Sequence, residues 1–297
     1  MKLKYKVIDN KYINIKDVLK SHFKISDKLL IKLKKNQHIY LNGVPEYVTK
    51  PINIRDLVEV NLDFEENFGN IVPTKMDLNI IFEDNSLIII DKPAGIPVHP
   101  SILHFDNSLS NGLAYYFQEK NIKKKIRPVN RLDKDTSGIV VFAKNEYIQE
   151  CLIQQMKSKK FLKEYFAILE GFLETSSGTI NAPISRKEGS IIEREINSNG
   201  DISITHFELI KNFSTKGKKL SLVKFKLETG RTHQIRVHSK YINHPILGDS
   251  LYGNNSNLIS RQALHSYKIN FIHPITNKKL EFQVNLPKDI KSILEIK

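Results

Sequence analysis

The segment from Pro128 to Lys144 places a carboxylate between a turn and an apolar strand, a common setting for a residue that performs chemistry. It reads PVNRLDKDTSGIVVFAK, and the run 139–142 is β-branched and aromatic, which predicts a buried strand. The preceding residues are turn formers, so Asp133 is expected to be held rigidly beside that strand. Arg131 adds a fixed cation, which is more than a turn requires. The alternative is that Asp133 and Asp135 only bond backbone N–H groups within the turn.

The charge balance of the whole chain favours a polyanionic partner such as nucleic acid. The 297 residues include 46 Lys and Arg against 32 Asp and Glu, which gives a formal net charge of +14. A composition rich in lysine, asparagine and isoleucine can also reflect genome bias, so charge alone does not decide the partner.

Cysteine usage and hydropathy indicate a soluble protein of the cytoplasm. The single cysteine, Cys151, excludes an internal disulfide framework and a cysteine-rich zinc or iron–sulfur site. No apolar run approaches the roughly twenty residues that span a bilayer. Lysines interrupt residues 1–10, where a signal peptide would need an apolar block.

Residues 1–72 form the first of two expected domains and contain lysine-rich helices followed by a hairpin. Apolar residues at helical spacing predict one helix near 15–23 and a second near 28–35, with lysines on their polar faces. Asn42-Gly43 after an apolar strand is a strong hairpin signal, and a further strand is expected over 56–62. Residues 63–74 combine charges with glycine and proline, so we expect a linker and hinge there.

Residues 73–297 form the second expected domain, in which short strands outnumber helices. The expected helices cover 109–117, 147–157 and 232–241. The expected strands cover 80–82, 87–90, 139–142, 165–169, 221–227 and 281–284. This order predicts an α+β fold with a large mixed or antiparallel sheet flanked by helices.

The segment around Asp133 closely resembles the catalytic motif of the RluA-type pseudouridine synthases, usually written His-Arg-Leu-Asp, two variable residues and Thr-Ser-Gly. Asn130 stands where most members carry histidine. Four further blocks resemble the same family in the same order, and they cover 91–100, 163–171, 229–249 and 261–274. Five matching blocks in order indicate this family and imply its pseudouridine synthase fold.

The resemblance implies a role for several residues. Asp133 matches the catalytic aspartate, Tyr165 matches the tyrosine that packs on the target base, and Arg236 matches the arginine that pairs with the aspartate. Arg131 matches the arginine that fills the space left by the flipped base, for which a planar guanidinium is well shaped. Further substrate contacts are expected from Asn130, Lys163, Arg231, His233 and Gln234. Taken without the family, Tyr165 is equally typical of a core residue on an alternating strand.

The N-terminal domain resembles the S4 RNA-binding module, through residues 25–28 and the Leu41-Asn42-Gly43 turn. This resemblance implies RNA contacts from Lys28, Lys32 and Lys35. The alternative is a small helical cap whose lysines form only a solvated face. Members with an S4 module act more often on large-subunit ribosomal RNA, which makes that RNA the expected partner, with transfer RNA as the alternative.

No cofactor or metal is expected, because turning uridine into pseudouridine moves no atom in or out. His233 and His238 are five positions apart, not the four that align two metal ligands on a helix. The residues leave open whether Asp133 attacks the ribose or abstracts a proton. A noncatalytic RNA-binding or ribosome-assembly protein is a further alternative, and a glycoside hydrolase would need a second well-placed carboxyl. A monomer is expected, since no coiled-coil heptad is present.

Overall fold

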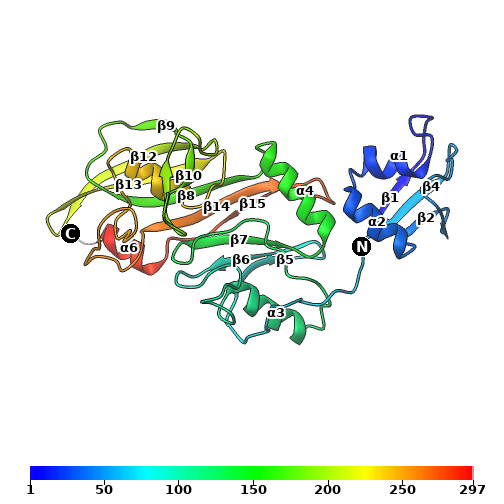
Figure 1. Cartoon of the computed structure of the whole chain (residues 1–297), viewed down its shortest axis with the longest axis horizontal. Coiled ribbons are helices and arrows are strands. Elements are labelled where there is room, and N and C mark those ends of the chain that lie inside the picture. The colour runs from blue at the N-terminus through cyan, green and yellow to red at the C-terminus, as the bar shows by residue number, and fades with distance from the viewer. Residues whose placement is uncertain (296–297) are drawn as a thin grey trace.

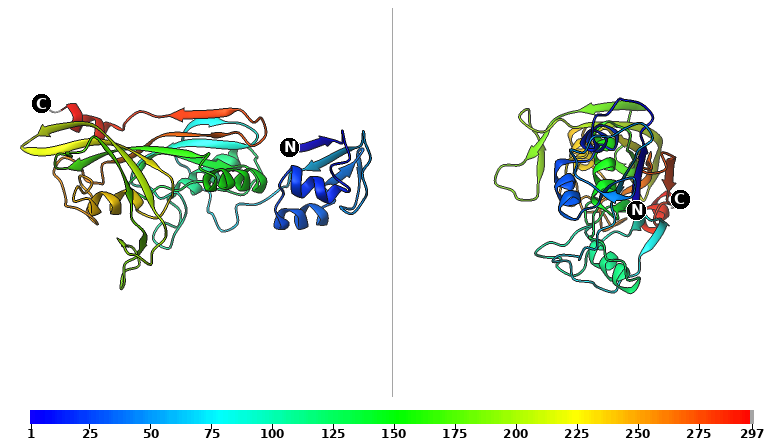
Figure 2. Two further views of the ribbon diagram at one scale, coloured as in Figure 1. Left: turned by 90° about the horizontal axis from the view of Figure 1, so that it is seen from above. Right: turned by 90° about the vertical axis from the view of Figure 1, so that its right-hand side faces the viewer.

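The computed structural model describes residues 1–295, which form a small N-terminal module and a larger part joined by a segment without helix or strand (Figure 1). Viewed from above, the module lies at one end of an elongated molecule, beyond the larger part (Figure 2). No helix within residues 1–295 is long and apolar enough to cross a membrane.

The N-terminal module packs two helical segments on a four-stranded antiparallel sheet with the order β1-β4-β2-β3. Its elements are β1 (Lys2–Lys6), α1 (Ile15–Asp17), the π-helical turn η1 (Val18–His22), α2 (Asp27–Lys35), β2 (Ile39–Leu41), β3 (Val44–Pro45) and β4 (Leu57–Asn61). The predicted hairpin is confirmed: Asn42 and Gly43 have φ values of 53° and 83°, as a tight turn between twisted strands requires. The strand β1 was not predicted, although lysines alternate with its apolar residues in the period-2 pattern of a half-buried strand.

The larger part contains a nine-stranded sheet with the path β5-β6-β7-β14-β8-β13-β12-β9, to which β15 is added beside β14. Its strands are β5 (Asn79–Glu83), β6 (Leu87–Lys92), β7 (Ser137–Ala143), β8 (Leu162–Glu170), β9 (Ser177–Asn181), β12 (Ile204–Thr215), β13 (Lys218–Leu227), β14 (Leu264–Ile272) and β15 (Lys279–Gln283). A separate hairpin consists of β10 (Ile184–Arg186) and β11 (Arg194–Ile196). Within this sheet only β7 and β14 run parallel, so the predicted α+β fold with a mixed sheet is confirmed.

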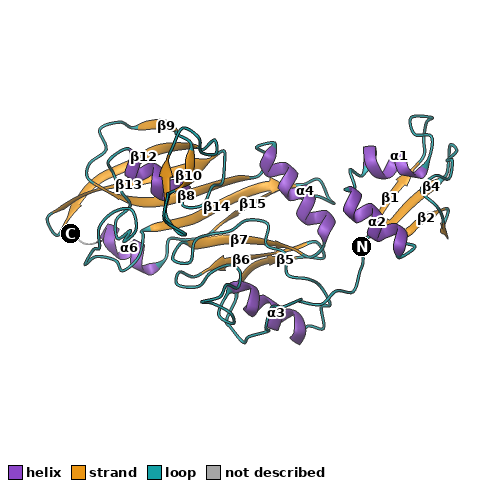
Figure 3. Ribbon diagram, viewed as in Figure 1, coloured by secondary structure: helices purple, strands orange, loops and turns teal. Residues whose placement is uncertain are grey.

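Helices cover both faces of the sheet (Figure 3). They are α3 (Leu109–Glu119), α4 (Glu146–Lys157), α5 (Gln234–Tyr241) and α6 (Lys288–Glu295). Along β6, Ile88 and Ile90 belong to the core that contains α3, whereas Leu87 and Ile89 belong to the core that contains α4. Burial on both faces explains why β6 and β7 read as continuous apolar runs.

Several elements differ from the sequence expectation for identifiable reasons. The helix expected from residue 232 begins at Gln234, because His233 has a left-handed φ of 59° and cannot continue a helix. The short strands β9 to β11 contain many polar residues, and the long strand β14 carries a lysine and an asparagine among its apolar residues, so neither was predicted.

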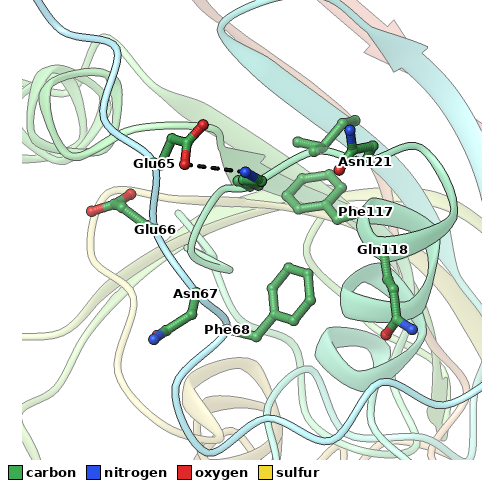
Figure 4. Close-up of a pocket in the computed structure, with 9 residues that line it drawn as sticks. Glu65, Glu66, Asn67, Phe68, Phe117, Gln118 and Asn121 are labelled. Atoms are coloured by element: carbon green, nitrogen blue, oxygen red, sulfur yellow. Dashed lines mark hydrogen bonds and ion pairs between the residues drawn. The ribbon is translucent and has the colours of Figure 1, made fainter.

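The connecting segment is bonded to the larger part at several points, although the sequence suggested a hinge. Glu66 accepts hydrogen bonds from Arg127 at 2.8 Å and from Lys32 of the module at 2.7 Å. Further along, the side-chain amide of Asn111 on α3 donates to the carbonyl oxygen of Val72 at 2.8 Å. Figure 4 shows part of this junction, a hollow of about 410 Å³ lined by Phe68 and other residues of the segment and of α3.

Candidate active site

A tight turn presents Asp133 immediately before β7. The Thr136 N–H donates to the Asp133 carbonyl oxygen at 3.1 Å, which closes the turn. Two residues later, Gly138 has a φ of 116° and pairs with Ser266 of β14. A Cβ atom at this glycine would lie 2.2 Å from the Ser266 carbonyl oxygen, so only glycine permits this approach. The turn is therefore anchored where two strands meet.

The Asp133 carboxylate faces a fixed arginine from a distant part of the chain. Its Oδ2 lies 3.4 Å from Nη1 of Arg236, whose side chain is 8% exposed. The remaining edge of this guanidinium donates to the fully buried Asp249, through Nε at 2.7 Å and Nη2 at 2.8 Å. This bidentate pair fixes the guanidinium plane and leaves Nη1 directed at the aspartate.

His233 forms the other side of the carboxylate. Its Nε2 lies 3.9 Å from Oδ1 of Asp133, and its Nδ1 shares a 2.8 Å hydrogen bond with the Tyr252 hydroxyl. That hydroxyl already accepts from the Arg194 N–H at 2.8 Å, which favours donation of its own proton to Nδ1 and a ring proton on Nε2. Burial lowers the pKa of His233, against the opposing field of Asp133, so the imidazole is neutral at pH 7.

Asp249 and Tyr252 were missed as site residues by sequence reasoning. Asp249 stands in a block that resembles the family, yet nothing in its spacing reveals that its carboxylate would hold Arg236. Tyr252 packs its ring 5.0 Å from the guanidinium carbon of Arg236, a cation–π contact that adds to this clamp. Chain separation between these residues and Asp133 explains the omission.

Tyr165 on β8 completes the pocket and is 5% exposed. Burial raises the pKa of its hydroxyl, so the ring remains a neutral phenol. The pocket has a volume of about 60 Å³ and is lined by Arg131, Leu132, Asp133, Thr136, Tyr165, Leu227, Arg231, His233, Gln234, Ile235, Arg236 and Leu264. Seven of the predicted site residues therefore meet in one place: Arg131, Asp133, Tyr165, Arg231, His233, Gln234 and Arg236.

Two of the expected substrate contacts have their polar atoms engaged within the fold. The Asn130 amide donates to the Ile139 carbonyl oxygen at 3.0 Å and accepts from the Val141 N–H at 2.8 Å. Gln234 lines the pocket, but its amide nitrogen donates to the Thr205 hydroxyl at 2.9 Å and its oxygen accepts from the Arg231 N–H at 3.0 Å. Both side chains hold backbone segments in place.

Lys163 and Arg231 are less buried than Tyr165 and Arg236. Lys163 is partly buried, and burial lowers the pKa of its ammonium. The Arg231 side chain is 42% exposed and pairs with Asp201 at 3.2 Å.

The three lysines of α2 lie in the N-terminal module, which is separate from the strands β7 and β8 beside the pocket (Figure 1). Lys32 is engaged by Glu66 and lies 4.1 Å from the centre of the Phe64 ring. Lys28 and Lys35 are exposed.

His238 is fully buried, and both of its ring nitrogens have protein partners. Nδ1 bonds the Thr205 hydroxyl at 2.8 Å and Nε2 bonds the Ala182 carbonyl oxygen at 2.9 Å. Across residues 1–295 no group of three His, Cys, Asp or Glu side chains is placed to hold a metal ion.

Known proteins share both the sequence and the fold. Residues 86–241 match the family described as RNA pseudouridylate synthase. The "Uncharacterized RNA pseudouridine synthase YhcT" of Bacillus subtilis is 40% identical over 277 residues, which span 93% of this chain and 90% of that protein. Ribosomal large subunit pseudouridine synthase D of Buchnera aphidicola is 39% identical over 238 residues, 75% of this chain and 74% of that protein.

Among solved structures, human RNA Pseudouridylate Synthase Domain Containing 1 superimposes with a TM-score of 0.59 at 26% identity, covering 70% of this chain and 83% of its own. The match to the family spans Tyr165, Arg236 and the turn that presents Asp133. The chain therefore belongs to the RluA-type RNA pseudouridine synthases, which are isomerases that act on RNA.

Proposed function

We propose that this enzyme converts specific uridines of large-subunit ribosomal RNA to pseudouridine, with Asp133 as the catalytic carboxylate. The observation that carries the proposal is the placement of Asp133 in the pocket, 3.4 Å from an arginine that Asp249 holds. Relatives named ribosomal large subunit pseudouridine synthase D favour ribosomal RNA over transfer RNA as the target.

The reaction breaks the bond between C1′ and N1 of uridine, turns the detached uracil and joins C5 to C1′; C5 then releases its hydrogen as a proton and N1 takes one up, so the product is an isomer of the substrate. Asp133 either attacks the electron-poor sugar carbon or removes a proton beside it, and the positive charge of Arg236 stabilises the carboxylate for both routes. Tyr165 supports the uracil ring while it turns, because a flat aromatic surface stacks on any base. The detached intermediate must be protected from bulk water, which would otherwise hydrolyse it, and two of the side chains that line the pocket, Tyr165 and Arg236, are themselves buried.

The target uridine must leave its helix before Asp133 can reach its ribose, which costs a few kcal/mol for a paired base. Arg131 is exposed at the rim of the pocket, where its guanidinium can stack in the space that the flipped base leaves. Arg231 is also partly exposed there and can contact phosphate. Lys163 lies in the same region, beside Gly230. A Cβ atom added to that glycine would lie 3.0 Å from the Lys163 Nζ.

We infer that residues 1–72 act as an S4-like RNA-binding module and residues 73–297 as the catalytic domain. Lys28 and Lys35 are exposed on α2 and suit phosphate contacts, although Lys28 also lies 3.7 Å from Glu146 of α4; Lys32 is held more closely, by Glu66 at 2.7 Å. The module would add affinity for RNA beyond the site of modification.

Pseudouridine mapping on total RNA incubated with purified protein tests this function. Wild type and Asp77→Asn, which removes an exposed carboxylate outside the pocket, should produce new pseudouridines in ribosomal RNA, and Asp133→Asn should produce none while still binding RNA. Product from Asp133→Asn would exclude Asp133 as the catalyst. Pseudouridines in transfer RNA alone would correct the substrate, and RNA binding without product from wild type would favour a noncatalytic assembly role.

A further inference from the structure

Residues 261–266, which lead into β14, contact the catalytic turn at four consecutive positions. Each contact joins a residue of this segment to one of residues 135–138. Arg261 Nη1 donates to the Asp135 carbonyl oxygen at 2.9 Å, and Gln262 Nε2 donates to Thr136 Oγ1 at 3.2 Å. His265 Nδ1 shares a 2.9 Å hydrogen bond with Ser137 Oγ, and Ser266 pairs with Gly138. The turn that presents Asp133 is thus supported from behind by a segment more than 120 residues away in the chain.

Arg261 is the charged member of this contact and its side chain is 8% exposed. Besides Asp135, its Nη1 lies within 3.2 Å of the Gln262 carbonyl oxygen and 3.3 Å of the Leu264 carbonyl oxygen. Its Nε and Nη2 donate to the two oxygens of Asp289 at 2.7 Å and 2.9 Å. A bidentate pair fixes the plane of a guanidinium, so Asp289 determines where Nη1 points.

Asp289 belongs to α6, which is anchored by Ile290 and Ile293, both fully buried in the core of the catalytic part. Figure 1 shows this helix near the C-terminus, beside the start of β14. Neither Arg261 nor Asp289 lines the pocket that contains Asp133. Their connection to the reaction therefore runs through the backbone of the turn and not through the substrate.

We propose that Arg261 and Asp289 are positioning residues through which the C-terminal helix α6 orients the catalytic carboxylate. Asp289 holds the guanidinium, the guanidinium holds the carbonyl of Asp135, and this peptide sets the direction in which Asp133 leaves the turn. The inference rests on the proposed role of Asp133. Its physical basis is that a displacement of about 1 Å at a reacting group can reduce the rate about 100-fold.

Steady-state kinetics on the mapped RNA, combined with hydrogen exchange of the free protein, test the link. Asp289→Asn removes the negative charge that holds the Arg261 guanidinium. Arg261→Lys keeps a positive charge, but a single ammonium group cannot bond both Asp289 and the Asp135 carbonyl oxygen. Both variants should reduce kcat about 10- to 100-fold, change KM less than about twofold and speed amide exchange over residues 133–138. The double variant should be no slower than the worse single variant, because both changes break one connection.

Arg127→Lys is the matched control. Arg127 is also 8% exposed in its side chain and forms a bidentate pair with Glu66, but it bonds no residue of the catalytic turn. Arg127→Lys should lower the melting temperature about as much as Arg261→Lys does and leave kcat unchanged. The inference is overturned if Arg127→Lys slows turnover as much as Arg261→Lys does, or if only KM changes. Unchanged exchange over 133–138 in both Arg261→Lys and Asp289→Asn also overturns it, and that readout needs no RNA, so it remains decisive if no product forms.

Discussion

Glu66→Gln is expected to destabilise the protein strongly at neutral pH, although the change only replaces one carboxylate by an amide in a connecting segment. The Glu66 side chain is 16% exposed and accepts hydrogen bonds from both Nη atoms of Arg127 at 2.8 Å and from Lys32 at 2.7 Å. Burial by itself would raise the pKa of this carboxyl. The bonds to Arg127 and Lys32 outweigh burial and lower the pKa to about 2.

The size and sign of the effect follow from that shift. The pKa falls from 4.5 in the unfolded chain to about 2 in the folded one. At ~1.4 kcal/mol per unit, ionised Glu66 contributes ~3 kcal/mol to the free energy of unfolding at pH 7. Because the folded pKa is the lower one, this contribution is complete above about pH 4.5 and is lost as the pH falls toward 2.

Urea denaturation followed by far-UV circular dichroism, at pH 7 and at pH 3, measures this difference. Glu65→Gln is the control, because its side chain is 79% exposed and makes one ion pair, with Lys123 at 3.2 Å, which is worth at most ~1 kcal/mol. The reasoning is refuted if Glu66→Gln lies within about 0.5 kcal/mol of wild type at pH 7, or if its deficit is as large at pH 3 as at pH 7.

Gly138→Ala should abolish soluble folding or turnover, because the added Cβ would lie 2.2 Å from the carbonyl oxygen of the facing strand; native-like circular dichroism with full activity would contradict this. Tyr165→Phe should retain most of the rate and Tyr165→Ala should lose about 1–3 kcal/mol of transition-state stabilisation, whereas equal losses would indicate that the hydroxyl acts. Replacing Lys28 and Lys35 by alanine should lower the salt dependence of RNA affinity by about 0.7–0.9 per lost phosphate contact, and an unchanged slope would make them a solvated face.

Local sequence was sufficient where a few neighbouring residues decide the structure. The Asn42-Gly43 turn was predicted because both residues tolerate positive φ, and β7 because its apolar run has no polar face. Asp133 was proposed as a candidate site residue in the same way, since its turn and its strand are adjacent in the chain. The resemblance to the family then pointed to Tyr165 and Arg236, which local pattern alone does not distinguish from a core residue and a surface cation.

The sequence by itself therefore determined the α+β architecture and an RNA-modifying chemistry, and it proposed the turn that presents Asp133 as the catalytic one. Only the tertiary structure decided which groups hold that turn and the arginine beside it. Arg236 donates two hydrogen bonds to Asp249. Arg261 bonds both Asp135, which lies 126 positions away in the chain, and Asp289, which lies 28 positions away. Such pairs have no fixed spacing, because any segment that the sheet brings close can supply the partner. A sequence shows which side chains can donate and accept, whereas the fold decides which of them meet.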